Sequence, residues 1–200
     1  MAATPGGTTV GLNSTVIGPS GSCTFSVLVR ATTAGPLSNT VTASDINQGA
    51  GSAGTAMLQV NAPLPPLLKK AFGTATVGLN GITTVTLTLT NPNPTVPLTV
   101  DVIDILPPGL LFATPNGLIN TCGGVFIMAT NRLEFDLNAT LAPSASCTLT
   151  VNVTGTIDGP ATNVSIASSN AGSSGFAFAT IFVVTRSRSA TPRIWQSETR

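Results

Sequence analysis

Few side chains in this sequence could carry out chemistry, and their types exclude most catalytic mechanisms. Histidine is absent, which removes the nucleophile systems that histidine activates and also the commonest metal ligand. The three cysteines lack the CxxC spacing of a zinc site. We therefore predict that the chain is not an enzyme and takes no cofactor.

The seven carboxylates include two pairs that are close in sequence, Asp101 with Asp104 and Glu134 with Asp136. Hydrolysis by paired carboxylates needs an open cleft and two environments that separate their pKa values. Glu134 and Asp136 lie on the polar side of an expected strand and should face water. Asp101 and Asp104 are candidates for calcium ligands, since oxygen ligands suffice. However, Asp104 precedes LPPG and is better explained as a turn cap, so we predict no metal site.

The elements that position these residues must form a core that contains very little charge. Only 8% of the residues are charged, 42% are apolar, and the net charge is +1. Disordered chains are poor in apolar residues, so this chain can bury a core. Its near-zero charge gives no electrostatic reason to bind nucleic acid or an anionic membrane. The longest apolar stretch, FAFATIFVV, is shorter than the roughly 20 residues of a membrane helix. We therefore expect no nucleic-acid partner and no membrane insertion.

One stretch of the chain occurs twice. Residues 17–60 align with residues 141–184 without a gap at a shift of 124 positions (147 − 23). The coinciding pairs include Pro19/Pro143, Ser20/Ser144, Cys23/Cys147, Val27/Val151, Gly35/Gly159, Pro36/Pro160, Asn39/Asn163 and Val60/Val184. This period is too long for a solenoid repeat and fits a whole small domain. We therefore expect a tandem array whose first repeat is truncated.

Short strands with alternating apolar residues dominate the chain. SCTFSVLV and SCTLTVNV both alternate with period two, which is typical of half-buried strands. The proline-rich NAPLPP at 61–66 is expected to be a linker. We predict three parts: the second half of a β-sandwich repeat at 1–62, a complete repeat at 63–185, and a polar, basic, disordered tail at 186–200. Seven to nine short strands with turn signals and no helical periodicity predict an all-β, immunoglobulin-like β-sandwich.

Several motifs of the second repeat resemble a known family. They are L-x-K-x-F (Leu68, Lys70, Phe72), TVTLTLTNPNP, DILPPGL, CGG, SCTLTVNVTG and G-x-x-x-N. Together they resemble the immunoglobulin-like conserved-repeat modules of bacterial surface proteins, the domain-of-unknown-function family numbered eleven and its close relatives. The resemblance covers all of 63–185 and only the second half of the motif set in 9–60. It implies tandem arrays on large secreted or wall-associated proteins, with structural or adhesive roles and no known catalysis.

The resemblance also bears on the cysteines. Modules of this kind often hold a pair such as Cys122 and Cys147 as a disulfide, and an exported protein would oxidise it. The alternative is two reduced cysteines in the core. Cys23 occupies the place of Cys147 in the first repeat, and its partner would fall at position −2 (122 − 124). We therefore expect Cys23 to be an unpaired thiol.

The resulting functional hypothesis is a spacer segment of a bacterial secreted or cell-surface protein, in contact with neighbouring repeats. The alternative is a module that binds an unidentified surface ligand, a glycan or a protein, through loops at one end of the sandwich. Tyrosine is absent and the single tryptophan lies in the tail. Because glycan binding usually uses exposed aromatic rings, this composition favours the spacer. MAATPGGTTV contains no secretory signal, which carries little weight in an array that is cut at its start.

A lysine–asparagine isopeptide crosslink is a further chemistry that surface sandwiches use. It needs a lysine and an asparagine beside a buried carboxylate. Lys69 and Lys70 lie in the first expected strand of the second repeat. The sequence contains no acid that is clearly buried, so it does not predict the crosslink.

Overall fold

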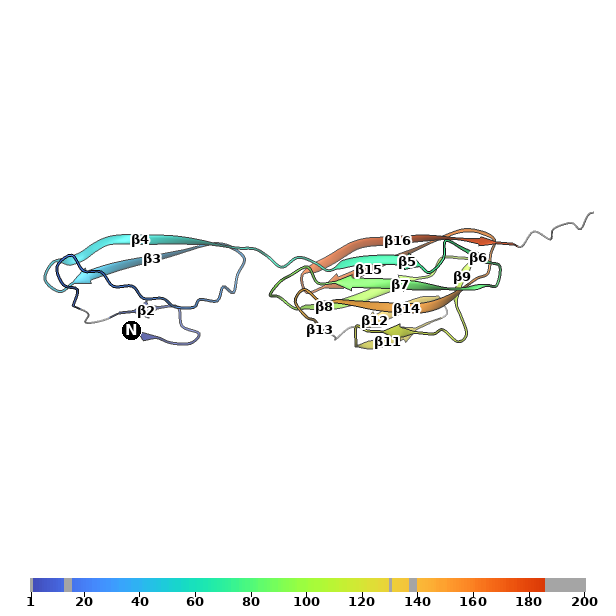
Figure 1. Cartoon of the computed structure of the whole chain (residues 1–200), viewed down its shortest axis with the longest axis horizontal. Helices are drawn as coiled ribbons and strands as arrows, with labels where there is room; N and C mark the ends of the chain where they lie inside the picture. The colour runs from blue at the N-terminus through green and yellow to red at the C-terminus, as the bar shows by residue number, and fades with distance from the viewer. Residues whose placement is uncertain (1, 13–15, 130, 137–139, 186–200) are drawn as a thin grey trace, which may run out of the picture. The chain divides into compact units, whose positions relative to one another are not determined.

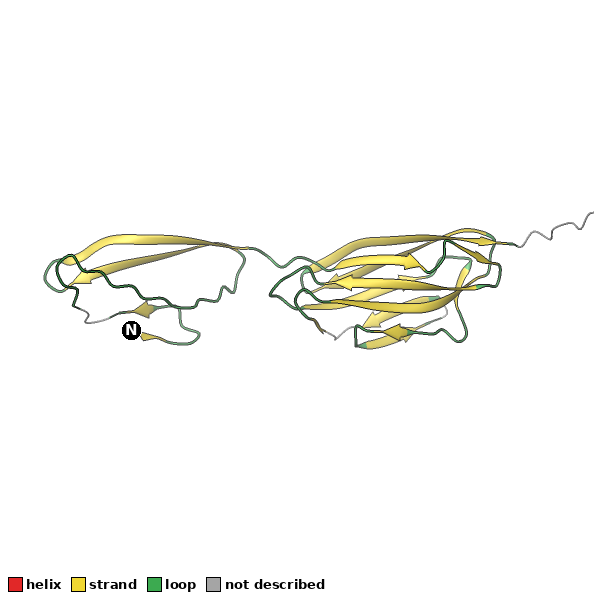
Figure 2. Cartoon of the chain, viewed as in Figure 1, coloured by secondary structure: helices red, strands yellow, loops and turns green. Residues whose placement is uncertain are grey.

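The computed structural model describes residues 2–12, 16–129, 131–136 and 140–185. Every helix or strand element in these residues is a β-strand (Figure 2). The chain divides into two compact units, Met1–Ala62 and Pro63–Arg200, which we call the N-terminal and C-terminal units. The predicted all-β, immunoglobulin-like sandwich is confirmed. The tail predicted at 186–200 lies outside the described residues.

The C-terminal unit consists of two β-sheets (Figure 1). The first sheet has the order β10 (Ile119–Asn120), β14 (Ser146–Gly155), β7 (Ile82–Thr90), β5 (Leu67–Phe72), with β9 (Leu110–Phe112) also on β14. The second has the order β11 (Val125–Met128), β12 (Arg132–Asp136), β8 (Leu98–Ile105), β15 (Gly159–Ser169), β16 (Gly172–Val184), β6 (Thr76–Gly78), with β13 (Thr140–Leu141) also on β8. All strand pairs among the described residues of this unit are antiparallel except β6 with β16, which is parallel.

Alternating side chains of the two sheets fill the space between them. In β7, Val85, Leu87 and Leu89 are at most 1% exposed, whereas the threonines at 84, 86, 88 and 90 are partly exposed. β-Branched threonine suits the outer face of such a strand. The first core cluster is Val77, Val85, Leu106, Leu110, Leu133, Val151, Val153, Ala161, Ile181 and Val183. The second core cluster is Leu87, Leu89, Leu98, Val100, Val102, Cys147, Leu149 and Ala167.

Two buried asparagines of the NPNP motif hold the start of the C-terminal unit in place. Asn93 exchanges two hydrogen bonds with the backbone of Leu64, both 2.8 Å long. The Asn91 amide donates to the carbonyl groups of Val96, Leu141 and Ala142. Because buried backbone groups must find partners, these amides replace the strand pairing that prolines cannot provide.

The N-terminal unit contains one long hairpin that repeats a hairpin of the C-terminal unit. Its strands are β1 (Ala2–Ala3), β2 (Val10–Gly11), β3 (Gly35–Asp45) and β4 (Gly49–Val60), and it pairs β1 with β2 and β3 with β4. At the shift of 124 positions, β3 coincides with β15 at both ends (159 − 35, 169 − 45). The strand irregularity between Thr42 and Ser44 also recurs between Ile166 and Ser168.

The strand predicted for SCTFSVLV is not present. Residues 21–32 belong to no strand, although the matching segment SCTLTVNV forms most of β14. In the C-terminal unit β14 pairs with β7 over nine residues, whereas no strand among the described residues of the N-terminal unit pairs with residues 21–32. A strand without a neighbour cannot satisfy its backbone hydrogen bonds within a sheet. The side chains of Leu28 and Val29 are accordingly 101% and 73% exposed.

We predict that the N-terminal unit is less protected from hydrogen exchange than the C-terminal unit. None of its residues 4–12 and 16–62 is buried, so its backbone amides have little protection from water. Hydrogen exchange of the full chain as a dilute monomer, followed by mass spectrometry, measures both units at once. Equal protection of residues 35–60 and 159–184 would contradict the prediction. These two hairpins have matching sequence patterns, but only the second is part of a larger sheet that shields it from water.

Candidate functional site

A group of polar side chains lies in the middle of the sandwich, between its two sheets. Lys70 comes from β5 of the first sheet, Asp104 from β8 of the second sheet, and Asn163 and Ser165 from β15 of the second sheet. The side chains of Lys70 and Asp104 are 0% exposed, and the residues Asn163 and Ser165 are 0% and 2% exposed.

The sequence around each of these residues explains why it points inward. Asp104 in β8 lies between Val102 of the second core cluster and Leu106 of the first, which directly follows the strand. In β15, Asn163 and Ser165 lie between Ala161 and Ala167, which again belong to different clusters. Since side chains two residues apart in a strand share a face, the polar group occupies the boundary between the two apolar clusters.

Hydrogen bonds join the four side chains: the Asp104 carboxylate contacts Lys70 and Asn163, and Lys70 also contacts Ser165. Lys70 Nζ donates to Asp104 Oδ1 at 2.6 Å and to Ser165 Oγ at 2.6 Å. Asn163 Nδ2 donates to Asp104 Oδ2 at 3.2 Å. The amine and the amide therefore contact the two different oxygens of the same carboxylate. The ion pair connects one sheet directly to the other.

Burial affects two polar groups at this site, the Lys70 amine and the Asn163 carbonyl oxygen. Loss of hydration lowers the pKa of the Lys70 amine, and the charge of Asp104 and the hydrogen bond to it offset part of this effect. Lys70 therefore loses its proton more readily than a lysine in water does. In addition, Asn163 Oδ1 is buried and has no hydrogen-bond partner among the described residues. Such an unmet buried acceptor is unusual in a folded protein and calls for an explanation.

The sequence does not predict this site when Asp104, which precedes LPPG, is interpreted as a turn cap. That interpretation is wrong: Asp104 lies within β8, and its oxygens contact Lys70 and Asn163. The buried position of Asp104 could have been predicted from the alternation in LTVDVIDIL, where Asp104 shares the face of Leu98, Val100 and Val102. The motif L-x-K-x-F carries the same signal, since Lys70 alternates with Leu68 and Phe72.

The structure does not bring Asp101 and Asp104 together as ligands of one cation. In β8 the residue Asp101 is exposed and Asp104 is buried, so they lie on opposite faces of the sheet. Among the described residues no three of the metal-ligating types His, Cys, Asp and Glu form a group that could hold a metal ion. The side chains of Glu134 and Asp136 lie outside what the structure describes.

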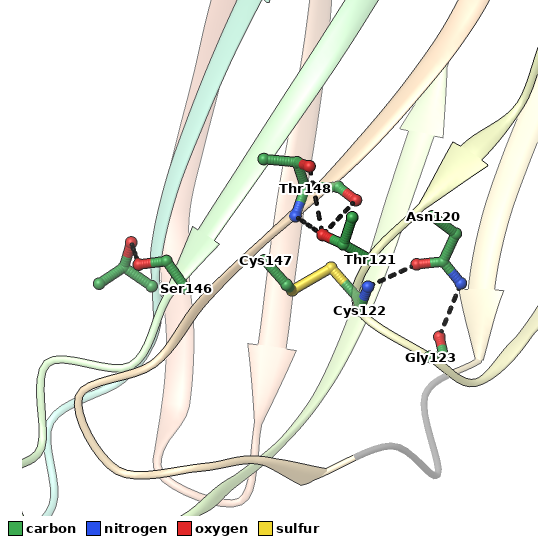
Figure 3. Close-up of a disulfide and its surroundings, with 8 residues drawn as sticks. Asn120, Thr121, Cys122, Gly123, Ser146, Cys147 and Thr148 are labelled. Atoms are coloured by element: carbon green, nitrogen blue, oxygen red, sulfur yellow. Dashed lines mark hydrogen bonds between the residues drawn. A yellow bond between two sulfur atoms is a disulfide. The ribbon is translucent and has the colours of Figure 1, made fainter.

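A disulfide joins Cys122 and Cys147, with a Cα–Cα distance of 4.9 Å (Figure 3). Cys147 lies on β14 in the second core cluster, and Cys122 packs against that cluster from the turn after β10. Asn120 holds the turn by accepting from the Cys122 backbone N–H at 2.7 Å and donating to the Gly123 carbonyl at 3.0 Å. The third cysteine, Cys23, is a free and exposed thiol.

The fold and its buried site define an immunoglobulin-like β-sandwich protein. The chain belongs to the family described as "Domain of unknown function (DUF7933)", whose profile matches residues 1–60 and 66–183. No curated protein matches the chain. In the described part of the chain, no helix has the length and apolar character needed to cross a membrane.

Several solved structures are similar in outline. The C-terminal domain of the Streptococcus agalactiae AgI/II polypeptide BspA is 16% identical, with 74% of this chain and 59% of that chain covered and a TM-score of 0.44. The collagen binding domain of the Erysipelothrix rhusiopathiae surface protein RspB is 10% identical, with 76% and 58% covered and a TM-score of 0.43. The bacterial hydrophobin BslA is 20% identical, with 64% and 99% covered and a TM-score of 0.42. Similarities this low carry no conclusion about the function of this chain.

We predict that peptide mapping without reductant links Cys122 to Cys147 and that alkylation labels Cys23 alone. The disulfide closes a loop of 25 residues, so its reduction should lower the free energy of unfolding by roughly 3–4 kcal/mol on the chain-entropy estimate. Urea unfolding with and without reductant measures this loss. A Cys23–Cys122 link, or three labelled thiols in protein made under oxidising conditions, would refute the pairing.

We predict that Asp104→Ala lowers the free energy of unfolding by about 3–5 kcal/mol, because it leaves Lys70 buried without its counter-ion. The matched control is Asp101→Ala in the same strand, which should cost about 1 kcal/mol or less because the residue is exposed. Urea unfolding of the two variants gives the comparison. Equal losses would show that the buried ion pair does not contribute more than a surface carboxylate.

Proposed function

We propose that this chain is a non-catalytic spacer segment of a bacterial secreted or cell-surface protein. It is built from tandem immunoglobulin-like repeats, of which residues 1–62 supply the second half of one and residues 63–185 a complete one. The observation that carries the proposal is the internal repeat, because β3 and β15 coincide end to end at the shift of 124 positions. A tandem array of domains becomes longer with each repeat, so spacing is the most general role of such an array.

Two further features support this proposal. The Cys122–Cys147 disulfide suits a protein that works in an oxidising environment, as secreted and surface proteins do. The linker before β5 is rich in proline, which favours extended and semi-rigid spacing between repeats. The similarity of the motifs to the surface-repeat family numbered eleven is consistent with the same location. Neighbouring repeats would then be the constant partners of each module.

One observation favours binding as a second function. The outer face of β16 exposes three phenylalanines, Phe176, Phe178 and Phe182, at 67%, 62% and 51%. The rings of Phe176 and Phe178 lie 6.2 Å apart. Their counterparts at the shift of 124 positions are Ser52, Gly54 and Leu58, so the fold of the hairpin does not require these rings. Exposed aromatic groups of this kind serve glycan or protein recognition. Glycan-array binding that Phe178→Ser abolishes would establish this function.

We predict that arrays of one to four copies of residues 61–185 grow in length in proportion to copy number. The 13 residues of β16 span about 40 Å at the usual rise of a strand, so each copy should add at least about that length. Small-angle X-ray scattering measures the maximum dimension of each array. As a control, a Gly/Ser linker of equal length in place of NAPLPP should give a smaller increment. Arrays that collapse into compact particles would refute the spacer.

A further inference from the structure

Three reactive groups meet in the buried site under conditions that favour condensation. The Asp104 carboxylate forms hydrogen bonds with both other groups. The Lys70 amine lies 2.6 Å from Asp104 Oδ1, and the Asn163 amide nitrogen lies 3.2 Å from Asp104 Oδ2. The first and second core clusters lie on either side, so water is excluded. Proximity and exclusion of water are the two general requirements for bond formation between weakly reactive groups.

We propose that Lys70 Nζ and Asn163 Cγ form an intramolecular isopeptide bond, with Asp104 transferring the protons. The bond connects β5 in the first sheet to β15 in the second. It is a modification site within one molecule and needs no cofactor. The inference does not depend on the spacer function proposed above, since the crosslink either forms or does not form whatever the parent protein does.

The contacts define the path of the protons. Lys70 gives a proton to Asp104 Oδ1, which leaves a neutral amine. The amine lone pair attacks Asn163 Cγ, and the carbonyl electrons move onto Oδ1 in the tetrahedral intermediate. Asp104 Oδ2 lies 3.2 Å from Asn163 Nδ2, so it can deliver a proton to the nitrogen that leaves. The electrons on Oδ1 then re-form the carbonyl as the Cγ–Nδ2 bond breaks. Asp104 accepts the second proton of the attacking nitrogen and passes it to the ammonia that leaves, which becomes ammonium.

The reaction balances without an oxidant or a reductant. The lysine ammonium has three hydrogens and the asparagine amide has two. One of these five stays on the new secondary amide and four leave as ammonium, while Asp104 returns to its carboxylate form. The buried positive charge is thereby removed from the core. This outcome relieves the desolvation cost of an ammonium group held between two apolar clusters.

Two further polar atoms, Ser165 Oγ and Asn163 Oδ1, are placed in a way that favours the condensation. Ser165 Oγ accepts a second hydrogen bond from Lys70 Nζ at 2.6 Å and fixes the direction of the amine. Asn163 Oδ1 makes no hydrogen bond among the described residues, so no donor holds the carbonyl group in its unreacted state. The first repeat retains an asparagine at the matching position, Asn39, although the flanking Thr40 and Val41 differ from Val164 and Ser165.

The crosslink is tested by the intact mass of the full chain under reducing conditions, after incubation of the folded protein at neutral pH. We expect a mass lower than that of the sequence by one ammonia. Peptide mapping should recover a branched peptide that joins Lys70 to Asn163, and trypsin should no longer cleave after Lys70. Lys70→Arg, Asp104→Asn and Asn163→Ala should each restore the full mass. The matched controls Lys69→Arg and Asn39→Ala should keep the loss of ammonia.

Two results would overturn the proposal. The first is the full sequence mass in wild-type protein that is folded by circular dichroism and unfolds cooperatively. The second is a loss of ammonia that persists in Lys70→Arg, since asparagine can also lose ammonia by forming a cyclic imide with its own backbone. If a variant fails to fold, the branched peptide in the wild-type digest still decides, because its presence establishes the bond and its absence refutes it.

Discussion

The ion pair between Lys70 and Asp104 is the interaction around which the C-terminal unit is arranged. It places two opposite charges between apolar layers, where each is costly without the other. Ser165 and Asn163 supply the remaining hydrogen bonds, and the strands that carry them must keep one register for these contacts to form. The first and second core clusters therefore meet at a fixed polar boundary, and a slip of either sheet would leave a buried charge without its partner.

Much of this fold follows from sequence because alternation is a local property. The threonine and leucine alternation of β7 predicts both the strand and its inward face, and the repeat predicts which hairpin recurs. The buried site was harder to predict, because a charged residue is expected on the surface. Asp104 shares its face with Val102, but only the lysine that comes from the opposite sheet, 34 residues earlier, makes that position tolerable. Such a pairing is not visible in either strand alone.

The two matching segments, 17–60 and 141–184, separate what a sequence pattern determines from what its surroundings determine. The β3/β4 hairpin and the β15/β16 hairpin form in both units, since each strand finds its partner within the segment. SCTFSVLV and SCTLTVNV share their pattern as well, yet only the second forms a strand. Its partner β7 lies far away in the chain, and the first copy has none among the described residues of its unit. An alternating pattern favours a strand, but the strand forms only where a neighbouring strand pairs with it.

The parallel pairing of β6 with β16 has a mechanical consequence. The chain enters the C-terminal unit through β5, reaches β6 three residues after β5 ends, and leaves after β16, with Thr76 opposite Phe182 and Gly78 opposite Val184. Tension that passes through β5 into β6, and from the other end into β16, therefore pulls two parallel neighbours in opposite directions along their length. Their hydrogen bonds are loaded in shear and must yield together, whereas an antiparallel pair pulled apart at one end opens one bond at a time. A bond from Lys70 to Asn163 would carry the same load covalently, before it reached this ladder.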